Sequence, residues 1–242
     1  MNFDLQNANH QYAANVQDSI TKAKRLYSAF SGNTTASLTF RIPVYSEFYQ
    51  NPFPDVATGL WYTNAVKFVK EKGIFKGFSD GMFRPLSTIS RQDFIVALAR
   101  YSGEDLTPYA SQSLGFKDVR KSEYYYSALV WGYKNGIITG YNDSRFGTGD
   151  NITREQVLTI LYRYVKDYLK QDIHLPTSHS FITDNYSDYK TVSAYAKDAV
   201  LWALIAGAIS GKSEGTLIAP KDPCARAEMA MIFYNCIENE II

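Results

Sequence analysis

The sequence Phe53-Pro-Asp-Val56 begins a segment that occurs three times in this chain. The first copy continues with Gly73-Ile, Gly77, Asp80-Gly, Phe83 and Ile89-Ser-Arg91. The second begins Phe116-Lys-Asp-Val119 and continues with Gly136-Ile, Gly140, Asp143, Phe146 and Ile152-Thr-Arg154. The third, looser copy holds Gly207-Ala-Ile, Gly211, Gly215, Leu217 and Ala225-Arg226-Ala-Glu228. A repeat of this kind indicates units that cannot bury their apolar faces alone and therefore pack against one another.

Each copy predicts a helix, a turn-rich loop and a second helix, because apolar residues recur at helical spacing in both halves. Gly73 is expected to end its helix, and Ser90 and Thr153 are expected to cap the helices that follow them. The predicted helices span residues 61–72, 91–102, 124–135, 154–169, 193–206 and 226–239. The fold class is therefore mainly α. We expect the three capped helices to lie around a common axis, with grooves between neighbouring repeats.

The repeats are predicted at residues 53–107, 116–170 and 181–242, after an N-terminal extension of residues 1–52. In the extension, the pattern predicts a helix over 11–30 and a strand over 36–45. The first residues lack the basic and apolar regions of a signal peptide, so either the protein is not exported or this chain is a fragment of a longer one.

Composition excludes several classes of function. A net charge of +1 gives no electrostatic case for nucleic acid. No stretch approaches the roughly 20 apolar residues that a membrane span needs. Cys224 lies just before the last predicted helix and Cys236 near its end, and because 12 residues of helix rise about 18 Å, the two are too far apart for a disulfide. Among the 242 residues are 19 tyrosines, whose rings can fill a core or stack on the apolar faces of sugars.

At the repeated residues the chain resembles the S-layer homology family. The family pattern is Phe-x-Asp-Val, a Trp-containing helix, Gly-Ile-x-x-Gly, an Asp-Gly-x-Phe turn and a Thr-Arg-Ala-Glu motif. The resemblance implies a pseudo-threefold spindle with a central helical bundle. It also implies a non-catalytic surface anchor of a Gram-positive bacterium, located at the cell wall. The expected partner is a secondary cell-wall polysaccharide attached to peptidoglycan, often bearing ketal-linked pyruvate, bound in grooves between repeats.

The expected site has the same residue types in each copy. Arg91, Arg154 and Arg226 can meet a pyruvate carboxylate with a bidentate fork, close to the free N–H groups of a helix start. Gly77, Gly140 and Gly211 would let the backbone approach the sugar. Ring faces would come from Trp61, Tyr124 and Tyr195. Each group also has a structural alternative. The arginines would tie repeats together, the aromatics would be core residues, and the glycines would be helix stops. Asp55 and Asp118 are expected to brace turns.

The extension has a resemblance of its own. The stretch His10-Gln-Tyr-Ala-Ala-Asn-Val-Gln17, followed by Phe40-Arg-Ile-Pro-Val-Tyr45, is similar to the closing part of bacterial endo-β-N-acetylglucosaminidases, which cut peptidoglycan. This implies an alternative function, the C-terminal part of such a hydrolase with its catalytic region upstream. Residues 1–50 contain one glutamate, Glu47, and show no site for the carboxylic acid, often with a second carboxylate, that glycoside hydrolysis usually needs in a cleft. We therefore predict no catalysis within this chain.

Other chemistries have little support in the sequence. There is no nucleophile elbow, zinc-ligand spacing or phosphate-binding loop. His174 and His179 lie in a polar connector and are expected to be solvated. A calcium module is a third alternative, because Ser79-Asp-Gly81 and Asn142-Asp-Ser144 resemble parts of calcium loops, but the regular spacing with a terminal glutamate is absent. We expect no cofactor and no metal, and the oligomeric state stays open.

Overall fold

The computed structural model describes residues 51–242. The helix predicted over 11–30, the strand predicted over 36–45 and the hydrolase-like stretch lie outside the described residues. Residues Ala57–Trp61 belong to a unit separate from the rest. The description below concerns the larger unit, which contains Pro52–Val56 and Tyr62–Ile242.

The larger unit is mainly helical, as the sequence predicted, and its described residues contain isolated β-bridges but no β-strand. The first helices of the three repeats are α2 (Thr63–Glu71), α4 (Tyr126–Lys134) and α7 (Lys197–Ala206). The second helices are α3 (Arg91–Ser102), α5 (Arg154–Arg163) and α8 (Arg226–Glu238). A π-helical turn, η3 (Tyr164–Tyr168), extends α5, and the short helix α6 (Ser180–Thr183) lies in the connector before the third repeat.

Helix α3 has the predicted bounds, whereas the first helices begin later than predicted. The chain forms turns at Tyr62 and Tyr125, where neither N-cap residue makes a side-chain capping hydrogen bond. In the third repeat a 3₁₀ turn, η5 (Ala194–Ala196), precedes α7. Gly73, Gly136 and Gly207 follow the three helices with φ values of 70°, 71° and 77°. These glycines are therefore the helix stops, because L side chains rarely adopt this conformation.

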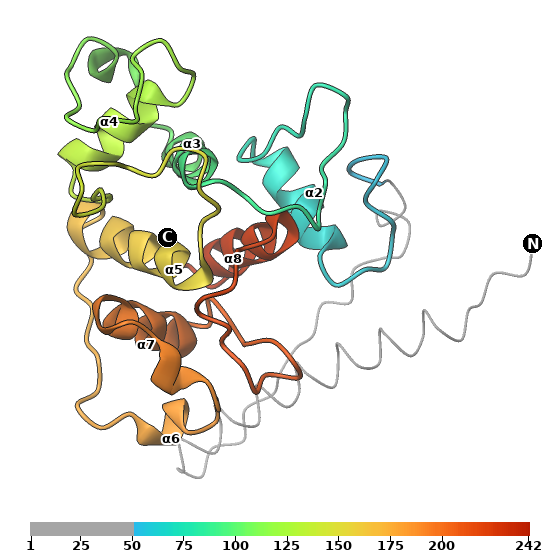
Figure 1. The fold of residues 1–242 in the computed structure, drawn as a ribbon. Coiled ribbons are helices and arrows are strands. Elements are labelled where there is room, and N and C mark those ends of the chain that lie inside the picture. The colour runs from blue at the N-terminus through green and yellow to red at the C-terminus, as the bar shows by residue number, and fades with distance from the viewer. Residues whose placement is uncertain (1–50) are drawn as a thin grey trace, which may run out of the picture. The chain divides into compact units, whose positions relative to one another are not determined.

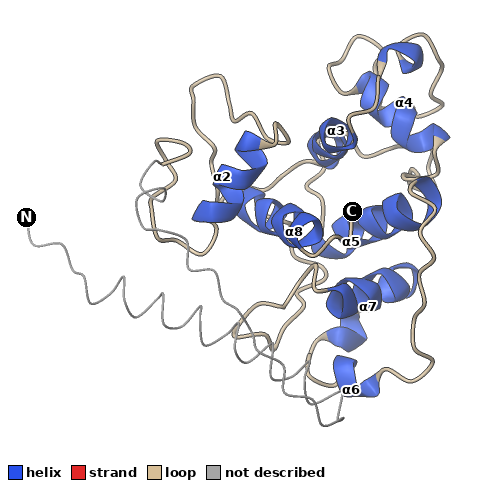
Figure 2. Cartoon of the chain, turned by 180° about the vertical axis from the view of Figure 1, so that it is seen from behind, coloured by secondary structure: helices blue, strands red, loops and turns tan. Residues whose placement is uncertain are grey.

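The helices pair between repeats rather than within them. Helix α2 packs on α8, α4 on α3, and α7 on α5. The first helix of each repeat thus covers the second helix of another repeat, in a closed cycle. In both views the second helices α3, α5 and α8 lie at the centre, with α2, α4 and α7 outside them (Figures 1 and 2). Each repeat thus needs a neighbour to cover its helices, which explains why the sequence carries several copies.

A ring of three backbone hydrogen bonds joins the repeats just before the central helices. Ile152 N–H donates to Ile89 O at 3.0 Å, Ile89 N–H to Cys224 O at 3.0 Å, and Cys224 N–H to Ile152 O at 2.8 Å. All three residues are buried. Cys224 therefore occupies the position that isoleucine holds in the other repeats. The ring closes the cycle of repeats with threefold periodicity.

The two cysteines are free and buried, in agreement with the prediction that they form no disulfide. Burial raises the pKa of each thiol to about 12. A thiol with so high a pKa is almost entirely protonated at neutral pH and is a poor nucleophile. Cys224 and Cys236 are therefore structural residues of the core.

The central helices begin with similar caps made from different residues. Ser90 Oγ accepts the Asp93 N–H at 3.2 Å. On α5 the Gln156 side chain accepts the Thr153 N–H at 3.1 Å, and on α8 the Glu228 carboxylate accepts the Ala225 N–H at 3.2 Å. The third repeat lacks the expected hydroxyl at Ala225, but the side chain three residues later still satisfies one N–H group at the helix start.

Candidate ligand-binding site

The three predicted arginines lie at the first positions of the central helices and are buried, with 5–7 % of each residue exposed. Each Nε donates to a backbone carbonyl in the loop of another repeat. Arg91 donates to Phe146 O at 3.0 Å, Arg154 to Ile218 O at 2.9 Å, and Arg226 to Phe83 O at 2.6 Å. These hydrogen bonds connect the same pairs of repeats as the helix contacts do. The arginines therefore tie the repeats together, as one of the two sequence interpretations proposed.

The loops that receive these bonds are braced by one aspartate each. Asp55 accepts the N–H groups of Phe83 and Arg84, and Asp118 those of Phe146, Gly147 and Thr148. These two turn-bracing roles were predicted and are confirmed. Burial alone would raise the pKa of Asp118, but the backbone hydrogen bonds outweigh it and lower the pKa from its usual value. The ionised carboxylate is thus held in place at neutral pH.

The third repeat has the same brace, which the sequence interpretation missed. Asp188 accepts the Ile218 N–H at 2.8 Å and the Ala219 N–H at 2.7 Å. The signal was Tyr186-Ser-Asp188-Tyr189, an aromatic residue followed by an aspartate at the spacing of Phe53-Pro-Asp-Val56. Tyrosine in place of phenylalanine concealed the match.

The glycines predicted to lie beside a ligand have a packing role in the structure. A Cβ atom on Gly77 would lie 2.6 Å from the Phe53 ring, and one on Gly140 would lie 2.2 Å from the Phe116 ring. A Cβ on Gly211 would lie 2.9 Å from both Leu217 O and the Tyr186 ring. The alternative that these glycines are helix stops is wrong, because other glycines four residues earlier end the helices. Glycine is required here so that the aromatic residue of each repeat can pack on the loop.

The matched aromatic residues are exposed rather than part of the core, so the alternative that they are core residues is wrong. The exposed fractions are 52 % for Trp61, 66 % for Tyr124 and 55 % for Tyr195. Each precedes the regular helix that was predicted to hold it. Tyr124 Oη donates to Asp93, and Tyr195 Oη donates to Glu155 at 2.9 Å. Trp61 belongs to the separate unit.

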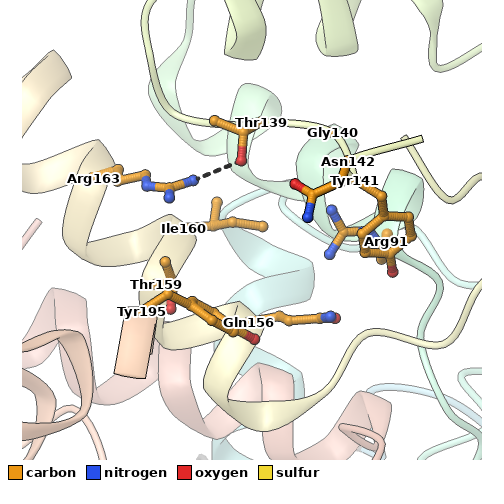
Figure 3. Close-up of a pocket in the computed structure, with 10 residues that line it drawn as sticks. All are labelled: Arg91, Thr139, Gly140, Tyr141, Asn142, Gln156, Thr159, Ile160, Arg163 and Tyr195. Atoms are coloured by element: carbon orange, nitrogen blue, oxygen red, sulfur yellow. Dashed lines mark hydrogen bonds between the residues drawn. The ribbon is translucent and has the colours of Figure 1, made fainter. Parts of the chain in front are cut away.

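A pocket of about 370 Å³ lies beside Arg91 (Figure 3). Residues from all three repeats line it: Arg91 from the first, Thr139, Gly140, Tyr141, Asn142, Gln156, Thr159, Ile160 and Arg163 from the second, and Tyr195 from the third. Of the predicted site residues, the pocket brings together Arg91, Gly140 and Tyr195. The described residues that line it do not include Arg154, Arg226, Tyr124, Gly77 or Gly211.

The pocket also holds residues that sequence reasoning missed. Gln156, Thr159 and Arg163 follow one another by three and four positions on α5, so they share one face of the helix. This polar face on an otherwise buried helix was the signal that could have identified them. Arg163 donates to Thr139 Oγ1 at 3.3 Å across the pocket (Figure 3). Amide, hydroxyl and guanidinium groups thus surround one cavity, together with two tyrosine rings.

Arg91 presents its terminal nitrogens to this pocket. Within the described residues its one side-chain hydrogen bond is from Nε, and Figure 3 shows the terminal nitrogens directed toward the middle of the cavity. The guanidinium carbon lies 4.8 Å from the Tyr141 ring centre and 4.9 Å from that of Phe146. Burial lowers the pKa of Arg91 from its usual value, while the hydroxyl of Tyr141 and the carboxylate of Asp150 act against this. A buried guanidinium of this kind is suited to an anionic ligand.

Comparison with known proteins decides the family. The sequence pattern of the S-layer homology domain matches residues 52–95, 115–158 and 185–230, which together are more than half of the chain. The chain belongs to the S-layer homology domain family. This domain is a non-catalytic anchoring module, and proteins that carry it are held at the cell surface. The predicted location at the cell surface is confirmed.

Similar proteins include surface proteins and large glycan-degrading enzymes. The chain is 28 % identical to the surface-layer 125 kDa protein of Lysinibacillus sphaericus over 87 % of its own length and 17 % of that protein. It is 29 % identical to an endoglucanase of Bacillus sp. (strain KSM-635) over 75 % of this chain and 18 % of the enzyme. It is 25 % identical to the cellulosome-anchoring protein of Acetivibrio thermocellus over 67 % of this chain and 35 % of that protein. The chain thus spans a minor part of each relative.

In this S-layer homology chain, Glu155 fixes the tyrosine that forms one wall of the pocket. Glu155 is buried and accepts hydrogen bonds from Ser193 N–H at 3.0 Å, Ser193 Oγ at 2.9 Å, Tyr195 Oη at 2.9 Å and Lys221 Nζ at 2.7 Å. Burial alone would raise the pKa of Glu155, but these hydrogen bonds outweigh it, so the pKa lies below its usual value of 4.5. The ionised carboxylate therefore joins the second S-layer homology repeat to the third.

We expect Glu155→Gln to lower the free energy of unfolding by about 1–3 kcal/mol at pH 7, because a buried ionised acceptor loses its charge. Because the folded-state pKa is lowered, the charge stabilises the fold above pH 4.5, and the effect disappears as the pH falls through the folded-state pKa. Urea denaturation of both proteins at pH 7 and at pH 3 measures this. A difference in stability that is equal at both pH values would contradict the assignment.

The loop aspartates that suggested calcium binding have other partners. Asp80 accepts the Met82 N–H at 3.0 Å and pairs with Arg84 at 2.7 Å, and Asp143 pairs with Arg145 at 2.6 Å. Among residues 51–242, no three His, Cys, Asp or Glu side chains converge as metal ligands would. None of the helices in the same range is long and apolar enough to cross a membrane.

Proposed function

We propose that this chain anchors an exported protein on the bacterial surface by binding a secondary cell-wall polymer that bears acidic sugars. The observation that carries the proposal is the pocket beside Arg91, where a guanidinium whose terminal nitrogens make no hydrogen bond within residues 51–242 meets hydroxyl, amide and tyrosine groups. The acidic group is proposed to be a carboxylate, such as that of a ketal-linked pyruvate. The parent protein's own activity is proposed to lie outside the chain.

The chemistry of the pocket suits such a ligand. A planar guanidinium fork binds a carboxylate through two parallel hydrogen bonds, which are stronger than bonds between neutral groups. Thr139, Asn142 and Thr159 offer donors and acceptors that match sugar hydroxyls. The ring of Tyr195 offers a flat apolar surface beside them. Since Glu155 holds that ring, the wall of the site is formed before the ligand binds, which lowers the entropy lost on binding.

The test uses cell-wall sacculi from the bacterium that makes the protein. We expect the purified chain to sediment with intact sacculi and to stay in solution after hydrofluoric acid has removed the attached polymer. Binding that survives the treatment would overturn the proposal in favour of peptidoglycan itself as the ligand. An absence of binding to both preparations would contradict the anchoring function.

A further inference from the structure

The three corresponding arginines each lie next to the third residue of a neighbouring central helix (α3, α5 or α8), and this residue differs among the three. It is Gln156 for Arg91, Glu228 for Arg154 and Asp93 for Arg226. Two of the three arginines therefore face a carboxylate supplied by the protein, and Arg91 faces a neutral amide.

The surroundings of Arg154 are neutralised within the protein. Its Nη1 lies 3.5 Å from Glu228 Oε2, and Glu228 Oε1 lies 2.8 Å from Lys212 Nζ. Lys212 follows Gly211, where the other two loops have an aromatic residue, and it also lies 3.3 Å from Asp222. These four side chains carry two positive and two negative charges. An incoming carboxylate would have to displace Glu228 from both of its cationic partners.

Arg226 is enclosed by aromatic rings. Its guanidinium carbon lies 5.2 Å from the ring centre of Phe75, 4.6 Å from that of Phe78 and 4.7 Å from that of Phe83. The carboxylate of Asp93, which accepts the Tyr124 hydroxyl, favours its charged form. Arg226 is therefore stabilised by rings and a protein carboxylate.

Arg91 also lies over two rings, those of Tyr141 and Phe146, but the lining of its pocket differs in charge. The ten described residues that line it include two arginines, Arg91 and Arg163, and no carboxylate. The carboxylates of Asp150 and Asp118 favour the charged form of Arg91, but neither is among the described residues that line the pocket. Asp118 also accepts hydrogen bonds from three backbone N–H groups. These lining residues thus carry two positive charges and no negative charge, which favours an anion in a site partly shielded from water.

We propose that the acidic group of the polymer binds at Arg91 and not at Arg154 or Arg226, and that Gln156 determines this choice because it places a neutral amide where the other two arginines meet a carboxylate. Arg163 supplies the second positive charge from the opposite side of the pocket (Figure 3). The inference rests on the proposed function, because it names the subsite for the acidic group of the same ligand.

The test is the variant Gln156→Glu, titrated with the polysaccharide that hydrofluoric acid releases from the walls. Glutamate has the shape of glutamine and can still accept the Thr153 N–H, as Glu228 accepts that of Ala225. The added carboxylate would pair with Arg91 as Glu228 pairs with Arg154. We expect the affinity to fall by roughly tenfold or more with little change in the unfolding midpoint. The control is Gln171→Glu, which adds the same charge at an exposed position outside the pocket.

A second pair of variants keeps the proposal testable should Gln156→Glu fold poorly. Arg163→Gln is expected to weaken binding by roughly threefold or more and to reduce its dependence on salt. Arg100→Gln, the matched change on α3, should leave both unchanged. Undiminished affinity of a folded Gln156→Glu or Arg163→Gln protein would overturn the inference while the proposed function stands. Failure of the wild-type chain to bind the polysaccharide would overturn both.

Discussion

Gly140→Ala is expected to lower the free energy of unfolding by about 2–4 kcal/mol, because the added methyl group would meet a packed ring and the backbone. The new Cβ would lie 2.2 Å from Cε1 of Phe116 and 2.7 Å from the backbone oxygen of Arg145. Backbone atoms in a braced loop cannot move aside, and the Phe116 ring is packed against Tyr133 and Phe146. Overpacking of this kind forces side chains and backbone out of their minima. The loop that would shift carries part of the pocket, so polymer binding should weaken too.

The control for this substitution is Gly115→Ala. Nothing lies within 4 Å of a Cβ at Gly115, and its φ is not in the left-handed region. We expect this variant to match the wild type within about 0.5 kcal/mol, since it meets neither a clash nor backbone strain. Urea denaturation of the three proteins gives the comparison. Equal stability of the Gly140 and Gly115 variants would show that the loop does not require close packing of the Phe116 ring.

Arg226→Ala is expected to destabilise the chain by about 2–4 kcal/mol, because this residue closes the cycle of repeats. Its Nε donates to Phe83 O, and this hydrogen bond joins the start of α8 to the loop of the first repeat. Without the arginine side chain, that carbonyl loses its charged donor. A cavity also forms among the rings of Phe75, Phe78 and Phe83. Arg120→Ala, at an exposed position, should change stability by less than about 0.5 kcal/mol. If the two variants unfold at the same urea concentration, the arginine does not join the repeats.

This structural role changes how arginine variants must be interpreted. An Arg91→Ala variant would lose both a proposed ligand contact and the bond to Phe146, so lower binding could reflect a loosened fold. Gln156→Glu avoids the difficulty, because it alters the charge of the pocket and leaves the Arg91 bond in place. The decisive variant is therefore a neighbour of the arginine rather than the arginine itself.

The sequence predicted the helices well because their signals are local. The bounds of α3 follow from Ser90, from the apolar spacing that runs from Phe94 to Leu98, and from Gly103, all of which act within a few residues. The later starts of α2 and α4 could not be read in this way. Tyr62 and Tyr125 fit a helical pattern equally well, and a turn outside the helix decides which residues face solvent.

The site was only partly predictable, because it depends on contacts between repeats. The repeated arginine indicated a shared role, and the structure adds the carbonyl partners, which lie 55 residues or more away in sequence. The difference between Gln156 and Glu228 was visible from the start. Its meaning depends on knowing that each faces the arginine of another repeat, which no single repeat reveals.

The most direct test of the account is a crystal structure of the chain with a short acidic fragment of the wall polymer. We predict that the fragment lies in the pocket beside Arg91, with its carboxylate bonded to the terminal nitrogens of that arginine and a sugar ring against Tyr195. A fragment seated beside Arg154 or Arg226, or elsewhere on the chain with the Arg91 pocket empty, would contradict it.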